Sequence, residues 1–148
     1  MPFSILPRIY SDVGGTHPAF SLKDSIVSEP SFVYYDEFSA WDTYRVLMSL
    51  VHLIDPEKGK DMVSSLVSKY EQGGWLRIFP YWNSYTSAMV GDYVIAMIGD
   101  AIMKDIPIHH LEKAYEGVPK NAFESPASHA DYAGGKGERS DFLYRVWL

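Results

Sequence analysis

Ser39-Ala40-Trp41-Asp42-Thr43-Tyr44-Arg45 and Glu71-Gln72-Gly73-Gly74-Trp75-Leu76 are the two runs that decide the fold of this chain of 148 residues. They lie inside the stretch from Ser31 to Asp105, which contains three segments with strong helical periodicity. The polar side chains that look out of place in a helical core lie at the ends or turns of these segments. They are Asp42, Arg45, Asn83 and Asp92.

The first two helices are predicted over 41–54 and 56–72. Ser39 is a suitable N-cap for the first helix, which puts Asp42 in its first turn. Asp55-Pro56 ends this helix and starts the next, and Gly73-Gly74 ends the second. The connection is very short, so the two helices are expected to form an antiparallel hairpin. The apolar face of the second helix consists of Met62, Val63, Leu66, Val67 and Tyr70.

A third helix is predicted over 86–104 and a fourth over 109–118. The third has an apolar surface too wide for a helix with one solvent side, which predicts several neighbours. Gly91 and Gly99 lie on a similar face and would allow another helix to approach closely. The connector over 75–85 is rich in large aromatic rings, so it either packs over the core or holds a ligand.

The remaining segments are predicted to be irregular. Residues 1–35 are expected to be extended because four prolines interrupt them, and residues 11–15 form a turn signal. Phe32–Tyr35 is a short β-prone run with no clear partner strand. Loop and tail are expected over 121–148. The chain is therefore mainly α, with its helical core over 41–118.

Composition excludes several functional classes. The net charge is −6 and the sequence has no basic cluster, which argues against a nucleic-acid partner. No apolar run is long enough to span a bilayer, and the first ten residues do not form a secretory signal. No cysteine is present, so the sequence does not indicate the redox compartment.

Several motifs together resemble the catalytic domain of glycoside hydrolase family 92, the calcium-dependent exo-acting α-mannosidases. The resemblance covers roughly residues 5–137, and the spacing of its runs makes it specific. It rests on Phe32-Val33-Tyr34-Tyr35-Asp36-Glu37-Phe38-Ser39-Ala40-Trp41-Asp42-Thr43-Tyr44-Arg45, on Glu71-Gln72-Gly73-Gly74-Trp75-Leu76, and on Trp82-Asn83-Ser84-Tyr85-Thr86 followed by Met89-Val90-Gly91-Asp92.

The resemblance implies a fold and a reaction. Residues 1–148 would be the N-terminal part of an (α/α)6-barrel catalytic domain, with a β-sandwich upstream and the rest of the barrel downstream. The reaction would be hydrolysis of terminal α-linked mannose of glycans, commonly α-1,2, with inversion. Inversion requires an acid and a base, two carboxyl groups some ~6.5–9.5 Å apart. In the family these groups and most calcium ligands lie C-terminal to this stretch, so the fragment is expected to be inactive alone.

The resemblance also implies which residues bind substrate. Asp42 matches the family's aspartate that binds the terminal mannose. A carboxylate there can accept hydrogen bonds from two adjacent sugar hydroxyls, which fixes the ring. Trp41, Arg45, Asn83 and Asp92 are further candidates for substrate binding. Two residues depart from the family pattern, which often has histidine at Tyr93 and proline at Arg77. The family also implies that the parent protein is secreted or periplasmic.

Structural alternatives remain for each of these residues. Asp42 is favoured in a first helical turn by the helix dipole, and Arg45 could pair with it one turn away. Asp92 could be a helix-start carboxylate that bonds the backbone. A metal cluster is suggested by the residue types His109, His110 and Glu112, but the sequence has no further ligand near them.

Two functional hypotheses follow. The chain is either a fragment of an α-mannosidase whose activity needs other segments, or a non-catalytic helical module with weak mannose binding through Asp42.

Overall fold

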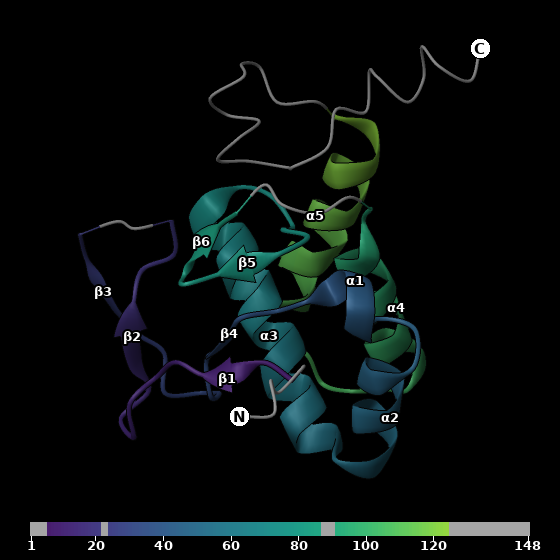
Figure 1. The fold of residues 1–148 in the computed structure, drawn as a ribbon, viewed down its shortest axis with the longest axis horizontal. Helices are drawn as coiled ribbons and strands as arrows, with labels where there is room; N and C mark the ends of the chain where they lie inside the picture. The colour runs from purple at the N-terminus through teal and green to yellow at the C-terminus, as the bar shows by residue number, and fades with distance from the viewer. Residues whose placement is uncertain (1–5, 22–23, 87–90, 125–148) are drawn as a thin grey trace.

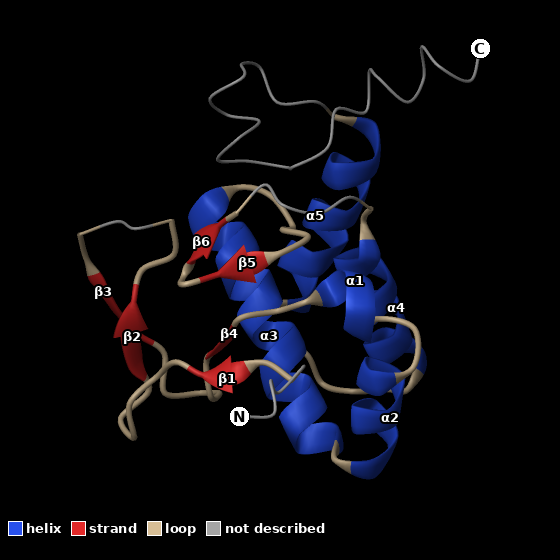
Figure 2. Ribbon diagram, in the orientation of Figure 1, coloured by secondary structure: helices blue, strands red, loops and turns tan. Residues whose placement is uncertain are grey.

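A computed structural model describes residues 6–21, 24–86 and 91–124. Five helices gather on one side of three small antiparallel sheets of two strands each (Figure 2). The helices are α1 (Ala40–Thr43), α2 (Leu47–Ile54), α3 (Pro56–Gly73), α4 (Tyr93–Met103) and α5 (Leu111–Phe123). A mainly helical fold is thus confirmed for this part of the chain, whereas its place in an (α/α)6 barrel stays a prediction.

Helix α3 is the centre of the fold. It runs between the strands and the other helices, and α2, α4 and α5 all pack against it (Figure 1). Every residue from Met62 to Tyr70 is buried, including the five apolar residues predicted for its inner face. Its ends are the predicted ones: the Asp55 side chain accepts from the Lys58 N–H, and Gly74 follows in the left-handed conformation with φ of 81°.

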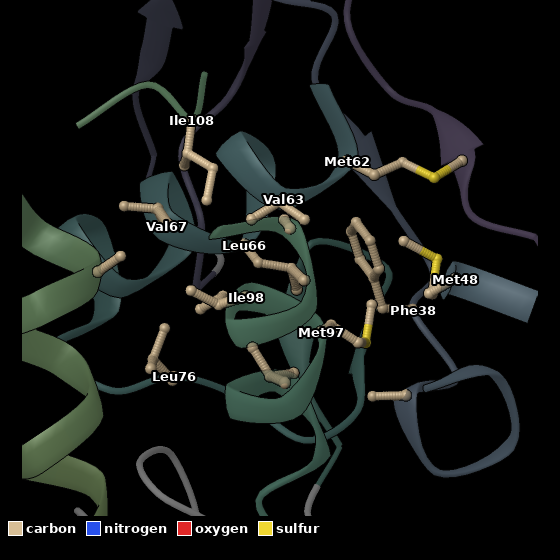
Figure 3. Close-up of a cluster of buried hydrophobic side chains, with 14 of the residues drawn as sticks. Phe38, Met48, Met62, Val63, Leu66, Val67, Leu76, Met97, Ile98 and Ile108 are labelled. Carbon is tan, nitrogen blue, oxygen red and sulfur yellow. The ribbon is translucent and has the colours of Figure 1, made fainter. Parts of the chain in front are cut away.

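The core fills the space between α3 and α4. Side chains from α2, α3, α4 and three connecting segments interdigitate there (Figure 3), and the labelled ones are all nearly or fully buried. These residues are Phe38, Met48, Met62, Val63, Leu66, Val67, Leu76, Met97, Ile98 and Ile108.

Three short sheets tie the N-terminal segment and the aromatic connector to α3. β1 (Arg8–Ile9) pairs with β4 (Tyr35–Asp36), so only the last residue of the predicted run 32–35 lies in a strand, and that strand does have a partner. β2 (Thr16–Pro18) pairs with β3 (Ile26–Ser28) after the predicted turn, in which the Asp12 carboxylate accepts from the Gly14 and Thr16 N–H groups. β5 (Pro80–Tyr81) and β6 (Ser84–Tyr85) form a tight hairpin within the connector.

The first predicted helix is in fact two. The chain leaves helical geometry between Thr43 and Leu47, and Val46 with φ of −127° caps α2. Across this break the Tyr44 ring stacks on Tyr93 of α4. A tertiary aromatic contact of this kind is not visible in the helical periodicity of the sequence.

The limits of the last two helices also differ from the prediction. α4 begins at Tyr93 because Gly91, with φ of 93°, breaks the helix before it; residues 87–90 lie outside the described part. Gly99 does not support a close helix approach, because an added Cβ there would meet no atom within 4 Å. α5 continues through Pro119 to Phe123, so residues 121–123 are helical, and the rest of the predicted tail from 125 lies outside the described residues.

Candidate functional site

Helix α1 presents Asp42 at its first turn. The backbone carbonyl of Ser39 accepts from the N–H groups of Asp42 and Thr43, both at 3.1 Å. The Ser39 hydroxyl donates to the Asp42 carboxylate instead of capping the helix backbone. The Asp42 side chain is exposed. The structure therefore places this carboxylate in the first turn of a helix, as predicted, and shows in addition that it is exposed and hydrogen-bonded to its neighbour.

A hollow of about 330 Å³ opens beside α1. It is lined by Trp41, Asp42, Tyr44, Arg45 and Tyr93. Its wall joins α1 to the start of α4, because the Tyr44 and Tyr93 rings stack with centroids 4.2 Å apart and planes 24° from parallel. Trp41 is 46% exposed, so an aromatic face remains open to a ligand. The hollow combines one carboxylate, one guanidinium and three aromatic rings.

Arg45 contacts Tyr44 and not Asp42. Its Nη2 donates to the Tyr44 hydroxyl at 2.9 Å, and its Cζ lies 5.5 Å from the centre of the same ring. The alternative in which Arg45 pairs with Asp42 is therefore not the arrangement seen. The acidic and basic groups of the hollow remain separate, and each could meet a different part of a ligand.

Asn83 lies elsewhere and is not brought into the hollow. It is buried at the turn of the β5–β6 hairpin with φ of 53°. Its Nδ2 donates to the carbonyls of Pro18 and Ala19 at 2.9 and 2.8 Å, and its Oδ1 accepts from the Tyr34 hydroxyl at 3.0 Å. These contacts tie the hairpin to β2, which is a structural role.

Asp92 lies next to the hollow without lining it. It is the N-cap residue of α4, directly before Tyr93, but its side chain makes no capping bond to the helix backbone. Its Oδ1 accepts from Asn121 Nδ2 of α5 at 3.2 Å. The alternative of a carboxylate bonded to its own helix is therefore wrong, and a residue that the sequence did not single out holds it.

A buried ion pair was also missed by the sequence analysis. Asp36 and Lys69 are both 0% exposed, with Nζ 3.4 Å from Oδ1. Lys69 also donates to the Tyr35 carbonyl at 2.8 Å and lies 3.7 Å from the centre of the Tyr34 ring. Burial lowers the pKa of the Lys69 ammonium, although Asp36 acts in the opposite direction. A signal existed, because Lys69 lies seven residues after Met62 and so on the apolar face of α3.

The described residues contain no cluster of acidic, histidine or cysteine side chains suited to a metal ion. Calcium takes six to eight oxygen ligands, and no group of three or more His, Cys, Asp or Glu side chains gathers to hold a metal in the described ranges. His110 Nδ1 lies 3.3 Å from Glu71 Oε1 and 4.0 Å from Glu112 Oε1, while the His109 ring packs near Phe32. The proposed histidine cluster is therefore divided between two different environments.

Comparison with known proteins decides the family. The glycosyl hydrolase family 92 catalytic domain matches residues 3–145. The chain belongs to this family. No curated protein sequence gives a significant match.

Among solved structures, the fold is similar to the GH92 α-mannosidase BT3965 from Bacteroides thetaiotaomicron, determined alone and in complex with mannoimidazole. Both comparisons give a TM-score of 0.73 and 28% identity over 85% of this chain. The chain spans only 17% of the length of that enzyme. None of the helices in the described residues is long and apolar enough to cross a membrane.

Proposed function

We propose that this GH92 chain carries the part of an α-mannosidase catalytic domain that holds the terminal mannose. The single observation that supports this most strongly is the hollow beside α1, where the exposed Asp42 carboxylate lies next to the open face of Trp41. A pyranose has hydroxyl groups that a carboxylate can accept from, and a C–H face that packs on an aromatic ring. The likeness to an α-mannosidase solved with mannoimidazole supports the same substrate class.

The proposed role of the hollow is binding and orientation. Asp42 accepts hydrogen bonds from two adjacent mannose hydroxyls, Trp41 packs on the ring, and Arg45 donates to a further oxygen. Asn83 and Asp92 belong to the family motifs but do not line the hollow. Their proposed role is to support the structure around it.

The complete reaction needs more than this hollow. Inverting hydrolysis uses two carboxyl groups, one to protonate the leaving oxygen and one to activate a water on the opposite face of the ring. The lining of the hollow contains one carboxylate. We infer that the acid, the base and the calcium ligands come from other residues of a complete domain, which hydrolyses terminal α-1,2-linked mannose with inversion in a secreted or periplasmic protein.

Calorimetry with methyl α-D-mannopyranoside tests the binding role. Asp42→Asn should weaken binding about 10- to 100-fold, because hydrogen bonds to a charged group contribute about 1.5–3 kcal/mol. Asp105→Asn is the matched control: Asp105 is an exposed carboxylate at φ of 55°, which asparagine tolerates, and it does not line the hollow. Equal affinities for the wild type and Asp42→Asn would remove Asp42 from the site.

Activity assays on the isolated chain and on a complete parent enzyme test different parts of the proposal. The isolated chain should release no sugar from an aryl α-mannoside with calcium present. Release that Asp42→Ala abolishes would show that the chain supplies the acid and base itself. In a complete parent enzyme, the same substitution should lower turnover severely, whereas in a binding module no parent activity exists to lose.

A further inference from the structure

Asn121 is a fully buried side chain of α5 with three hydrogen bonds to other segments. Its Oδ1 accepts from the Leu76 N–H at 3.0 Å, and its Nδ2 donates to the Leu76 carbonyl at 2.8 Å. The amide thus pairs with one residue of the connector much as a neighbouring strand would. The same Nδ2 also donates to Asp92 Oδ1 at 3.2 Å.

These bonds join three segments that are distant in the sequence. Leu76 follows the end of α3, Asp92 precedes α4, and Asn121 lies in the last turn of α5. The Asp92 carbonyl accepts from the Ile95 N–H at 3.0 Å, which is the first turn of α4. Because the Asp92 side chain does not cap α4 itself, the start of this helix is held from α5.

The start of α4 determines one wall of the hollow. Tyr93 directly follows Asp92, and its ring stacks on Tyr44. The ring also lies over Gly91, where an added Cβ would be only 2.4 Å from Tyr93 Cε2. With Gly91 on one side and Tyr44 on the other, the Tyr93 ring can keep its place only while the backbone at Asp92 stays fixed.

We propose that Asn121 is a positioning residue for the hollow: it fixes Asp92 and Leu76, and through them the Tyr93 wall against Tyr44. This proposal rests on the proposed function only in that the ligand of the hollow is taken to be mannose. An amide suits the position because it offers an acceptor for the Leu76 N–H and two donors for the Leu76 and Asp92 oxygens. Neither a hydroxyl nor a carboxylate supplies that set.

The sharpest variant is Asn121→Asp, which changes one heavy atom and almost no volume. At pH 7 it places a second carboxylate against the Asp92 carboxylate and the Leu76 carbonyl, so the contact becomes repulsive. When the introduced group is protonated at lower pH, it can again donate to one of them. Gln72→Glu is the matched control, because the Gln72 amide binds the Phe20 N–H and the Ser68 hydroxyl on α3.

The first readout is amide hydrogen exchange by NMR. Asn121→Asp should lower the protection of the Ile95 amide at least tenfold more than that of the Leu50 amide in α2. Acidification that protonates the introduced carboxyl should restore much of the difference. Gln72→Glu should not lower the protection of the Ile95 amide more than that of the Leu50 amide. Equal loss of protection at Ile95 and Leu50 would show general destabilisation and overturn the proposal. If Asn121→Asp does not fold, Asn121→Ser, which keeps one hydrogen-bonding atom, provides the same comparison.

The second readout is a double-mutant cycle on affinity for methyl α-D-mannopyranoside. Asn121→Asp should weaken binding several-fold in the wild type but cause no further loss in a Tyr93→Ala background, because its effect passes through that ring. Additive losses would contradict the proposal. If the wild type binds no mannoside, the proposed function fails, and the exchange experiment alone decides whether Asn121 holds the start of α4.

Discussion

At the residue scale, the buried ion pair of Lys69 in α3 and Asp36 in β4 should contribute most to holding the N-terminal segment against α3. Lys69→Met leaves the Asp36 charge buried without its partner, which costs about 3–5 kcal/mol. Urea denaturation should show this loss in the free energy of unfolding. The control is Lys113→Met, which removes an exposed pair with Glu116 and should leave stability unchanged.

A double variant separates loss of the charge pair from loss of packing. Lys69→Met combined with Asp36→Asn should be more stable than Lys69→Met alone, because the buried charge is then gone while the bond from the Asn83 N–H to this side chain is kept. If the double variant were as unstable as the sum of both single changes, the charge pair would not be the cause.

His17 should make the protein sensitive to acid. The ring is buried and stacks on Tyr34, with the two ring centroids 3.6 Å apart. Burial, together with the nearby Lys69 charge, lowers the pKa of His17 from 6.5. Below pH 6.5 the unfolded chain therefore binds a proton that the folded chain does not, so stability falls as the pH drops toward the lowered folded-state pKa. The decrease should be smaller in His17→Phe, which keeps the stack. Identical pH profiles would exclude His17 as the cause.

Individual residues differ in how far the sequence could place them. Asp42 could be placed in a first helical turn because Ser39 is a local signal. Asn83 and Asp92 have partners 64 and 29 residues away in sequence, and no local pattern contains such pairings. Asn121 carries no local signal in the sequence, and its role depends on bonds to Leu76 and Asp92, 45 and 29 residues away.

At the scale of elements, the two glycines Gly74 and Gly99 should respond in opposite ways to alanine. Gly74 has φ of 81° at the end of α3 and free space around it, so Gly74→Ala should cost about 1–2 kcal/mol from backbone strain alone. Gly99 is inside α4 with equal free space, so Gly99→Ala should gain about 0.5–1 kcal/mol. Thermal unfolding shows whether each substitution raises or lowers stability. A more stable Gly74→Ala variant would show that the helix does not end there.

Helix α3 was predicted almost to the residue, because Asp55-Pro56 and Gly73-Gly74 are local start and stop signals. The break between α1 and α2 was not predicted, because apolar residues keep their helical spacing through it. The three small sheets were not predicted either. Their strands are two or three residues long, and pairing of β1 with β4 joins segments that no periodicity connects.

At the scale of the whole molecule, α2 has an uncovered apolar face. Val46, Leu50, Leu53 and Ile54 follow helical spacing and are 46–72% exposed. A face of this kind is typical of a surface that packs against another element, and the chain matches only 17% of the similar α-mannosidase.

The isolated chain should therefore bind a hydrophobic dye such as ANS and self-associate with rising concentration. Leu50→Glu together with Leu53→Lys should reduce both effects without changing the circular dichroism spectrum. Val13→Glu, at a fully exposed turn residue, is the control. A monodisperse wild-type monomer that binds no dye would show that the exposed α2 face does not cause self-association.

The measurement that tests the central claim most directly is an NMR titration of the isolated chain with methyl α-D-mannopyranoside. If the hollow beside α1 holds the terminal mannose, the shift changes should concentrate on the Trp41 indole and on the amides of Asp42, Arg45 and Tyr93, and Asp42→Asn should suppress them. Shift changes confined to other parts of the chain, or none at high mannoside concentration, would contradict the assignment of this hollow as the mannose site.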